Sequence, residues 1–254
     1  VKALASGADA VILDLEDAVA PDAKPAARVA VAEFVRGLPS DHERPAVLVR
    51  VDAAHLDDDL AAISALSLDA IYLPKATSAS VADVDERLGA QLVPLVALIE
   101  SAQGLLDASA IAAHGRVRNL AIGEADLCAE LGVSRDGSDA LWPLRMSIVV
   151  ASAAAGIDPP TAPVSTDFRD LDAYRRSTEA LKHAGFGARS AIHPAQVAVI
   201  DEVFAPTHEE RAEALALVTA FDDAMTRGEG VFIGPDGRMV DLAVVRHARR
   251  ALAN

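Results

Sequence analysis

Acidic side chains follow three apolar runs of this sequence, at residues 10–13, 95–99 and 120–122. The acids that follow these runs are Asp14, Glu16, Asp17, Glu100, Glu124 and Asp126. An apolar run without polar alternation is typical of a strand covered on both faces, as in a parallel sheet. The carboxyl ends of such strands form one face of a parallel barrel, so the acids would gather there and require a cation or shared protons to offset their repulsion. Because oxygen ligands favour Mg²⁺ or Mn²⁺, the pattern predicts a site for one of these metals.

Glu100 and Asp126 are the residues that we expect to bind the metal. Glu100 ends one run and Asp126 follows the next by a few residues, so neighbouring strands would bring both carboxylates to one barrel mouth. Two acidic ligands completed by water are a usual arrangement for Mg²⁺. The alternative is that each acid only caps the helix that follows it. Asp14, Glu16 and Asp17 could be divided among the barrel interior, a supporting position near the metal and the start of a helix.

Two cationic side chains also follow strand-like runs. Arg50 closes an apolar run and would point into the same mouth, where its guanidinium could hold a carboxylate or a developing enolate oxygen; the alternative is an ion pair with Glu16 or Asp17. Lys75 could form a Schiff base with a carbonyl substrate, or an ion pair with the acids. Nearby acids raise the pKa of a lysine and so favour the ion pair.

Three further positions could take part in chemistry. Residues 123–126 open a helix, and backbone N–H groups in this segment, around Gly123 and Ala125, could receive a substrate carboxylate. His193 ends a strand, and we favour a hydrogen-bonded structural role for it over a role as a base. From spacing alone, Asp241 is an ordinary helix N-cap.

The composition excludes several function classes. The chain has 254 residues, a formal charge of −15 and only 4% aromatic residues, which argues against binding nucleic acid by its backbone or by base stacking. The only cysteine, Cys128, allows no disulfide within the chain and is expected to be a buried thiol. No apolar run reaches the roughly 18 residues of a membrane span, and no signal peptide is recognised, so we expect a cytoplasmic enzyme.

Strand-like and helix-like segments alternate along the chain, which is the pattern of repeated βα units. The predicted strands are residues 9–14, 46–51, 70–73, 92–99, 118–122, 161–165 and 189–192. Clear helical segments lie between them, at residues 25–36, 141–155 and 171–183. The alternation predicts an α/β fold of the TIM (β/α)8 barrel type.

Seven strands are one short of a closed eightfold barrel, and the first recognisable element is a helix-like piece at residues 1–6. We therefore expect the first strand to be missing from this chain. Residues 1–206 are predicted to form the barrel domain without strand one, and residues 207–254 a C-terminal helical extension. The elements expected in the extension are a helix at 208–227, a hairpin around 234–237 within a hinge at 228–239, and a last helix at 242–252.

Four ordered motifs extend over most of the chain: GADAVILDLEDAV at 7–19, LPK at 73–75, IESAQG at 99–104 and AIHPAQV at 191–197. Together with residues 204–207 and 237–241, they closely resemble the citrate lyase β-subunit-like group of the HpcH/HpaI aldolase superfamily, which contains acyl-CoA lyases. The resemblance implies a TIM barrel that binds Mg²⁺.

The resemblance also implies roles for particular residues. Glu100 and Asp126 match the metal-binding positions, and Arg50 matches a position that faces the substrate thioester or carboxylate. Asp241 matches a catalytic acid or base that the C-terminal segment delivers into the site of a neighbouring subunit, which requires a homotrimer or hexamer.

The chain departs from this group at three points. Members usually begin with a strand and a Pro-Gly turn that this sequence lacks. Asp52 stands where Asn is common, which leaves the substrate preference open, and Ala188–Arg189 replaces a frequent Gly-Lys pair.

We expect Mg²⁺-dependent, reversible cleavage of a 3-hydroxyacyl-CoA, such as malyl-CoA or citramalyl-CoA, into an acyl-CoA and a 2-oxo acid. In this hypothesis the metal lowers the pKa of the 3-hydroxyl group and Arg50 stabilises the enolate oxygen. Backbone N–H groups at Ala125 and Asp126 hold the departing 2-oxo acid, and Asp241 handles the proton at the enolate carbon. Gly123, Glu16 and Lys75 are further substrate-contacting candidates.

Three other functions compete with this hypothesis. The chain could be the β subunit of a citrate lyase complex that acts on a citryl thioester of an acyl carrier protein. It could be a Schiff-base aldolase that uses Lys75. It could also be a non-catalytic scaffold whose acids only cap helices.

Overall fold

The computed structural model describes residues 2–39, 44–134, 139–234 and 237–253. The chain forms two compact units, Val1–Ile200 and Asp201–Asn254, which are described separately. The domain boundary expected between residues 206 and 207 remains a prediction.

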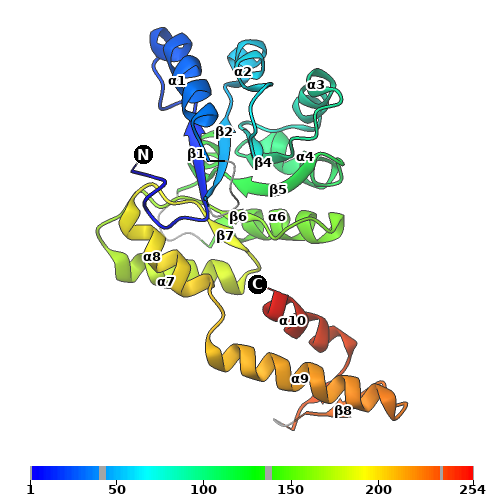
Figure 1. The fold of residues 1–254 in the computed structure, drawn as a ribbon. Coiled ribbons are helices and arrows are strands. Elements are labelled where there is room, and N and C mark those ends of the chain that lie inside the picture. Colours follow the sequence, from blue (N-terminus) through cyan, green and yellow to red (C-terminus); the bar gives the residue numbers. More distant parts are fainter. Residues whose placement is uncertain (1, 40–43, 135–138, 235–236, 254) are drawn as a thin grey trace. The chain divides into compact units, whose positions relative to one another are not determined.

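The first unit is built on a seven-stranded, fully parallel sheet whose strands follow one another in chain order (Figure 1). The strands are β1 Ala10–Asp14, β2 Ala46–Arg50, β3 Ala70–Leu73, β4 Leu95–Ile99, β5 Val117–Ile122, β6 Thr161–Ala162 and β7 Ala188–Arg189. Each one overlaps a predicted strand, although β4, β6 and β7 are shorter than expected. The sheet curls in the manner of a TIM-type barrel, and within the described residues no strand joins β7 to β1.

Helices connect consecutive strands. The α-helices that begin in this unit are α1 Lys24–Arg36, α2 Leu56–Ile63, α3 Ser78–Leu88, α4 Ala102–Ala112, α5 Glu124–Leu131, α6 Leu141–Ala155, α7 Leu171–His183 and α8 Pro194–Phe204, of which α8 includes the boundary at Ile200. Two short 3₁₀ helices, η1 Pro21–Ala23 and η2 Ala53–His55, precede α1 and α2. The helix expected at the start of the chain is wrong for its described residues, because residues 2–6 form turns closed by bonds from the Ala5 and Ser6 N–H groups to Lys2 and Ala3.

Both faces of the sheet are buried, as the continuous apolar runs predict. Alternate side chains such as Val49, Ile71 and Ile99 pack with α1 to α4 in the main core. The side chains between them form a separate inner cluster. Its members are Leu48, Ala70, Tyr72, Val96, Leu98 and Ala121. This alternation leaves the ends of the strands as the places where polar side chains can gather.

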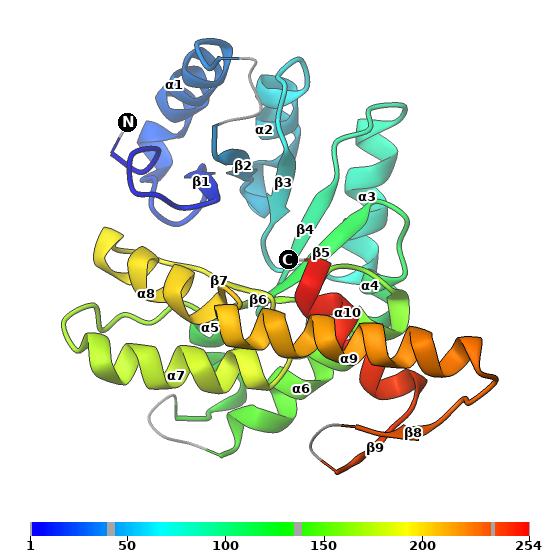
Figure 2. The same cartoon turned by 60° about the horizontal axis from the view of Figure 1, so that its bottom comes forward.

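The second unit contains α9 His208–Thr226, the antiparallel pair β8 Phe232–Ile233 and β9 Met239–Val240, and α10 Leu242–Ala253 (Figure 2). Thr207 and Glu210 form a capping box at the start of α9. The predicted hairpin is present as this strand pair, although residues 235–236 of its turn lie outside the described residues. Among the described residues, none of the helices is long and apolar enough to span a bilayer.

Gly104→Ala is expected to destabilise the protein even though alanine is the better helix former. A Cβ atom at this position of α4 would lie 2.5 Å from the backbone oxygen of Ala76, in the segment after β3. Overpacking costs about 1–3 kcal/mol, against a gain of about 1 kcal/mol in helix propensity. Because the atom met at 2.5 Å belongs to the backbone, the cost should lie in the upper part of this range, and urea unfolding should show a net loss of about 1–2 kcal/mol. Gly115→Ala, which meets nothing within 4 Å, is the matched control, and equal stability of both variants would contradict the prediction.

Candidate active site

An ion pair joins the carboxyl ends of β1 and β2. Asp14 and Arg50 are the last residues of these strands, and the parallel register places them opposite one another. The Arg50 guanidinium donates two hydrogen bonds to the carboxylate, Nε to Oδ1 at 2.7 Å and Nη2 to Oδ2 at 2.6 Å. This bidentate geometry fixes the plane of the guanidinium. Arg50 therefore forms an ion pair, but its main partner is Asp14, and of the two partners expected from the sequence Glu16 lies 3.1 Å from Nη1.

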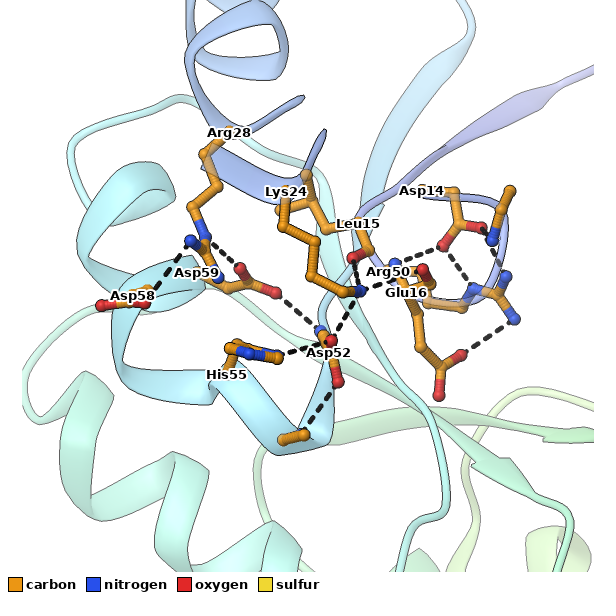
Figure 3. Close-up of polar contacts among 12 residues, drawn as sticks. Asp14, Leu15, Glu16, Lys24, Arg28, Arg50, Asp52, His55, Asp58 and Asp59 are labelled. Atoms are coloured by element: carbon orange, nitrogen blue, oxygen red, sulfur yellow. Dashed lines mark hydrogen bonds and ion pairs between the residues drawn. The ribbon is translucent and has the colours of Figure 1, made fainter. Parts of the chain in front are cut away.

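Glu16 connects Arg50 to Lys75 (Figure 3 shows the Arg50 side of this contact). Its Oε1 accepts a hydrogen bond of 2.6 Å from the Lys75 ammonium. Its Oε2 lies 3.1 Å from Arg50 Nη1, which is an ion pair whose angle does not make it a hydrogen bond. Glu16 is buried, and burial raises the pKa of its carboxyl group despite the two cations, with Asp17 contributing negative charge. The segment after β1 thus brings a carboxylate between two cations from β2 and the end of β3.

Lys75 adopts a left-handed backbone conformation, with φ of +49°, and it is the only described residue other than glycine with a positive φ. This conformation costs a side-chain-bearing residue about 1–2 kcal/mol, so the surrounding contacts must maintain it. Here the Lys75 N–H donates to Glu100 Oε1 at 2.8 Å while its side chain reaches Glu16. The hydrogen bond to Glu16 raises the pKa of Lys75. Its ammonium is therefore retained at neutral pH, which disfavours Schiff-base formation.

Glu100 is a buried carboxyl group directly after β4. Burial, followed by the negative charges of Glu16 and Asp126, raises its pKa from the ordinary value of 4.5 to about 7. The space beside it depends on Gly123, because a Cβ atom there would lie 2.6 Å from Glu100 Oε2. The Gly123 N–H bonds to the Ile99 oxygen at 2.9 Å, which fixes this close approach.

The first turn of α5 presents Asp126 at the surface and buries Glu124. Glu124 accepts two bonds from Arg145 of α6, at 2.5 and 2.9 Å, and the guanidinium of Arg145 lies over the ring of Trp142. Glu124 therefore fixes the helix start. The N–H groups of this first turn, including that of the exposed Ala125, have no partners within the helix, because the helix has no carbonyl group four residues before them.

The chemistry of this site suits a divalent cation. Glu100 holds its proton up to about pH 7 because of burial and neighbouring negative charge, and a bound cation would relieve both. Glu100 and Asp126 supply carboxylate oxygens, which leaves further positions for water or substrate oxygens. Within the described residues, no group of three or more His, Cys, Asp or Glu side chains forms a metal-binding cluster, so the protein would contribute few ligands.

Asp52 lies in a buried ionic contact that sequence reasoning missed. Burial alone would raise its pKa, but hydrogen bonds from Lys24, the Ala54 N–H and His55 lower it to about 2. The Lys24 ammonium lies 2.6 Å from Asp52 Oδ2 (Figure 3). The signal in the sequence is Lys24, which stands directly before the predicted helix at 25–36 and between two predicted strands that are each followed by an acid.

The remaining candidates are accounted for locally. His193 stacks on Phe168, with ring centroids 4.7 Å apart, and its Nδ1 accepts from the Ala195 N–H, as expected of a structural histidine. Arg189, at one of the departures from the resembled group, lies over the ring of Tyr174 and bonds to α7 side chains.

Asp241 Oδ1 accepts from the Val244 N–H at 3.1 Å, as an N-cap of α10 does. Its catalytic role stays a prediction.

The chain matches a known protein family. The sequence pattern of the HpcH/HpaI aldolase/citrate lyase family matches residues 1–194. The chain belongs to this family. The family expected from the motifs is thus confirmed.

Three relatives of this family member cover almost all of its length. It is 36% identical to a (3S)-malyl-CoA thioesterase of Cereibacter sphaeroides strain ATCC 17025, over 99% of this chain and 88% of the relative. It is 34% identical to an L-malyl-CoA/beta-methylmalyl-CoA lyase of C. sphaeroides strain ATCC 17029, over 97% and 87%. It is 32% identical to the citrate lyase subunit beta of Leuconostoc mesenteroides subsp. cremoris, over 97% and 85%.

A solved structure of the family agrees with the fold. The CitE protein from Mycobacterium tuberculosis, in complex with magnesium, acetoacetate and coenzyme A, matches with a TM-score of 0.79 and 34% identity. The match covers 99% of this chain and 91% of that one. The predicted TIM-type α/β class is therefore confirmed.

The raised pKa of Glu100 predicts how the stability of this family member depends on pH. The folded state binds the Glu100 proton more tightly than the unfolded state, so the free energy of unfolding of the metal-free protein should fall as pH rises from about 4.5 to about 7. The expected contribution is on the order of 3 kcal/mol, since one pKa unit corresponds to about 1.4 kcal/mol. Urea unfolding across this range should show that Glu100→Gln removes it, whereas Glu86→Gln at an exposed position of α3 does not. Parallel pH profiles for wild type and Glu100→Gln would contradict this.

Proposed function

We propose that this chain is a Mg²⁺-dependent carbon–carbon lyase that cleaves a 3-hydroxyacyl-CoA, of the malyl-CoA or citramalyl-CoA type, into an acyl-CoA and a 2-oxo acid. The observation that carries this proposal is the buried Glu100 carboxyl group, whose pKa is raised to about 7 beside Asp126, at the same strand ends as Arg50. The names of the relatives support it, since they include a malyl-CoA lyase and a citrate lyase subunit. So does the magnesium and coenzyme A complex of the M. tuberculosis protein.

Glu100 and Asp126 would hold the metal in this proposal. Bound Mg²⁺ supplies Lewis acidity toward hydroxyl and carboxylate oxygens of the substrate. The Lys75 N–H orients Glu100 through its bond to Oε1, and the absent side chain of Gly123 leaves room for Oε2. The protein thereby holds the carboxyl group in one orientation before substrate arrives.

Arg50 is the residue that we assign to the enolate. On cleavage, the 3-hydroxyl group loses its proton, the bond between C2 and C3 breaks, and the electron pair moves onto the acyl-CoA fragment. A guanidinium has more N–H donors than the contacts to Asp14 and Glu16 use, so Arg50 can still donate to the developing oxyanion. Because those two acids already hold it in place, little reorganisation is needed during the reaction.

The start of α5 would receive the carboxylate of the 2-oxo acid. Amide groups at Ala125 and Asp126 lie at the positive end of the helix, which favours an anion, whereas the expected donor at Gly123 is already bonded to the Ile99 oxygen. Lys75, whose ammonium is half exposed, and Glu16 complete the proposed substrate-contacting set. The amides at the start of α5 give the product acid a binding surface that does not depend on Arg50.

Asp241 is proposed to take up the proton that the 3-hydroxyl group loses and to deliver it to C2 of the enolate, from the C-terminal segment of a neighbouring subunit in a homotrimer or hexamer. Its position as an N-cap holds its carboxylate at the start of α10. Asparagine caps helices equally well, so Asp241→Asn removes the acid without removing the cap.

Thioester hydrolysis is the second candidate activity. The observation that favours it is the 36% identity to a relative named (3S)-malyl-CoA thioesterase. Hydrolysis releases a free thiol and leaves the carbon skeleton intact, whereas cleavage releases a 2-oxo acid and leaves the thioester intact. The two products therefore separate the candidates directly.

The purified chain should release a 2-oxo acid from malyl-CoA, citramalyl-CoA or citryl-CoA in the presence of Mg²⁺ and lose this activity in EDTA. Arg50→Lys keeps the charge but loses the bidentate geometry, so kcat should fall about 100-fold while Mg²⁺ affinity is retained. Thiol release without 2-oxo acid would favour the thioesterase. Borohydride trapping that is insensitive to EDTA would favour a Schiff base at Lys75. Activity only on a carrier-bound citryl thioester would favour the citrate lyase subunit.

Mixing two inactive variants tests the sharing of a site between subunits. Glu100→Gln and Asp241→Asn should each be inactive alone, and their co-expressed mixture should regain about a quarter of wild-type activity, since random assembly places both native residues in one site in four. A mixture that stays inactive, while its subunits are shown to assemble together, would place both residues of each site in one subunit.

A further inference from the structure

Lys24 places a buried ammonium group behind the site described above. It is the first residue of α1 and is only 7% exposed. Its Nζ donates to the backbone oxygens of Leu15 and Glu16, at 2.8 and 3.1 Å, and lies 2.6 Å from Asp52 Oδ2 (Figure 3). One cation therefore binds both the segment after β1 and the segment after β2.

These two segments carry the ionic cluster of the site. Glu16 extends its side chain toward Arg50 and Lys75 from the main chain that Lys24 holds. The Leu15 N–H also bonds to the Arg50 oxygen at 2.9 Å, which continues the pairing of the two strands by one step. A shift of the Leu15 and Glu16 carbonyls would therefore move the Glu16 carboxylate relative to its two cations.

A second buried pair holds the other end of this arrangement. Asp59 of α2 is 1% exposed, and its carboxylate accepts from the Asp52 N–H at 2.7 Å and from Arg28 Nε at 2.6 Å. Both the main chain and the side chain of Asp52 are thus held by residues of α1 and α2. Lys24 therefore bonds to an Asp52 side chain that is itself held in place, and the same ammonium group bonds to the Glu16 main chain.

We infer that Lys24 is a positioning residue, which acts through the Glu16 main chain to hold the Glu16 carboxylate between Arg50 and Lys75. The expected effect on kcat rests on the proposed function. The expected effect on the position of Glu16 rests only on the contacts of Lys24. The metal-binding candidates Glu100 and Asp126 lie after β4 and in α5, and no direct contact joins them to Lys24 among the described bonds; Glu100 is held by the Lys75 main chain, whereas Glu16 bonds to the Lys75 side chain. Lys24 should therefore affect turnover and leave metal binding largely unchanged.

The opposite end of the sheet offers a matched control. Arg116, directly before β5, donates to the backbone oxygens of Gly89, Gln91 and Val93 and pairs with Asp85. Like Lys24, it is a largely buried cation that binds loop carbonyls and one carboxylate. Its removal should destabilise the protein without altering the site.

A double-mutant cycle between Lys24 and Glu16 tests the kinetic part. Lys24→Met should lower kcat about 10–100-fold, while the Mg²⁺ dissociation constant from calorimetry stays within about threefold of wild type. The variant Lys24→Met with Glu16→Gln should have the same kcat as Glu16→Gln alone, because Lys24 acts only through Glu16. Arg116→Met should keep kcat within about threefold. Additive losses in the cycle, or an equal loss in Arg116→Met, would overturn the inference.

Hydrogen exchange gives a readout that does not require activity. The Glu16 and Ala18 N–H groups bond to the Asp14 carboxylate at 2.9 and 3.0 Å. Lys24→Met should speed exchange at these amides and Arg116→Met should not; unchanged exchange in Lys24→Met would overturn the inference. If the wild type cleaves none of the CoA esters, the proposed function fails while exchange still decides the role of Lys24. Lys24→Gln, which keeps an N–H donor, replaces Lys24→Met if that variant does not fold.

Discussion

The concentration of negative charge at one end of a parallel sheet is the constraint on which the rest of this structure depends. Asp14, Glu16 and Glu100 all lie at or just after strand ends in a chain with a formal charge of −15. Like charges at short range and low dielectric repel strongly, so each carboxylate must meet a cation, a donor or a proton. Asp14 meets Arg50, Glu16 meets Arg50 and Lys75, and Glu100 takes up a proton near neutral pH. The acid left with the weakest compensation by cations is the one best suited to a metal.

Backbone features of the site follow from the same constraint. Lys75 adopts its left-handed conformation where its N–H reaches Glu100 and its ammonium reaches Glu16, so one residue compensates two acids. Gly123 lets Glu100 lie against the start of α5, and the Glu124–Arg145 pair fixes that helix start. Strain and close packing thus occur where the charged groups are held in place, as is common at functional sites.

Much of this arrangement could be predicted from the sequence, because apolar runs and the residues after them are local signals. The seven strands, and the position of Glu100 and Arg50 at one end of the sheet, follow from such runs. β6 ends at Ala162, earlier than predicted, because Pro163 has no N–H group to continue a ladder. The helix expected at residues 1–6 is wrong over residues 2–6, because so short a segment gains too few hydrogen bonds to offset the cost of nucleation. The Lys24–Asp52 and Glu124–Arg145 pairs could not be predicted, since they join residues far apart in sequence through side-chain directions that only packing decides.

Calorimetric titration of the purified protein with Mg²⁺ at pH 7, with no substrate present, tests the central claim that Glu100 and Asp126 hold the metal while the other acids are compensated by cations. Loss of even an indirect contact to a metal ligand costs about tenfold or more in affinity, so Glu100→Gln should weaken Mg²⁺ binding by more than about tenfold. Glu86→Gln, which alters an exposed carboxyl group of α3 away from the site, should leave the affinity within about threefold. Equal Mg²⁺ affinity in wild type and Glu100→Gln would contradict the account.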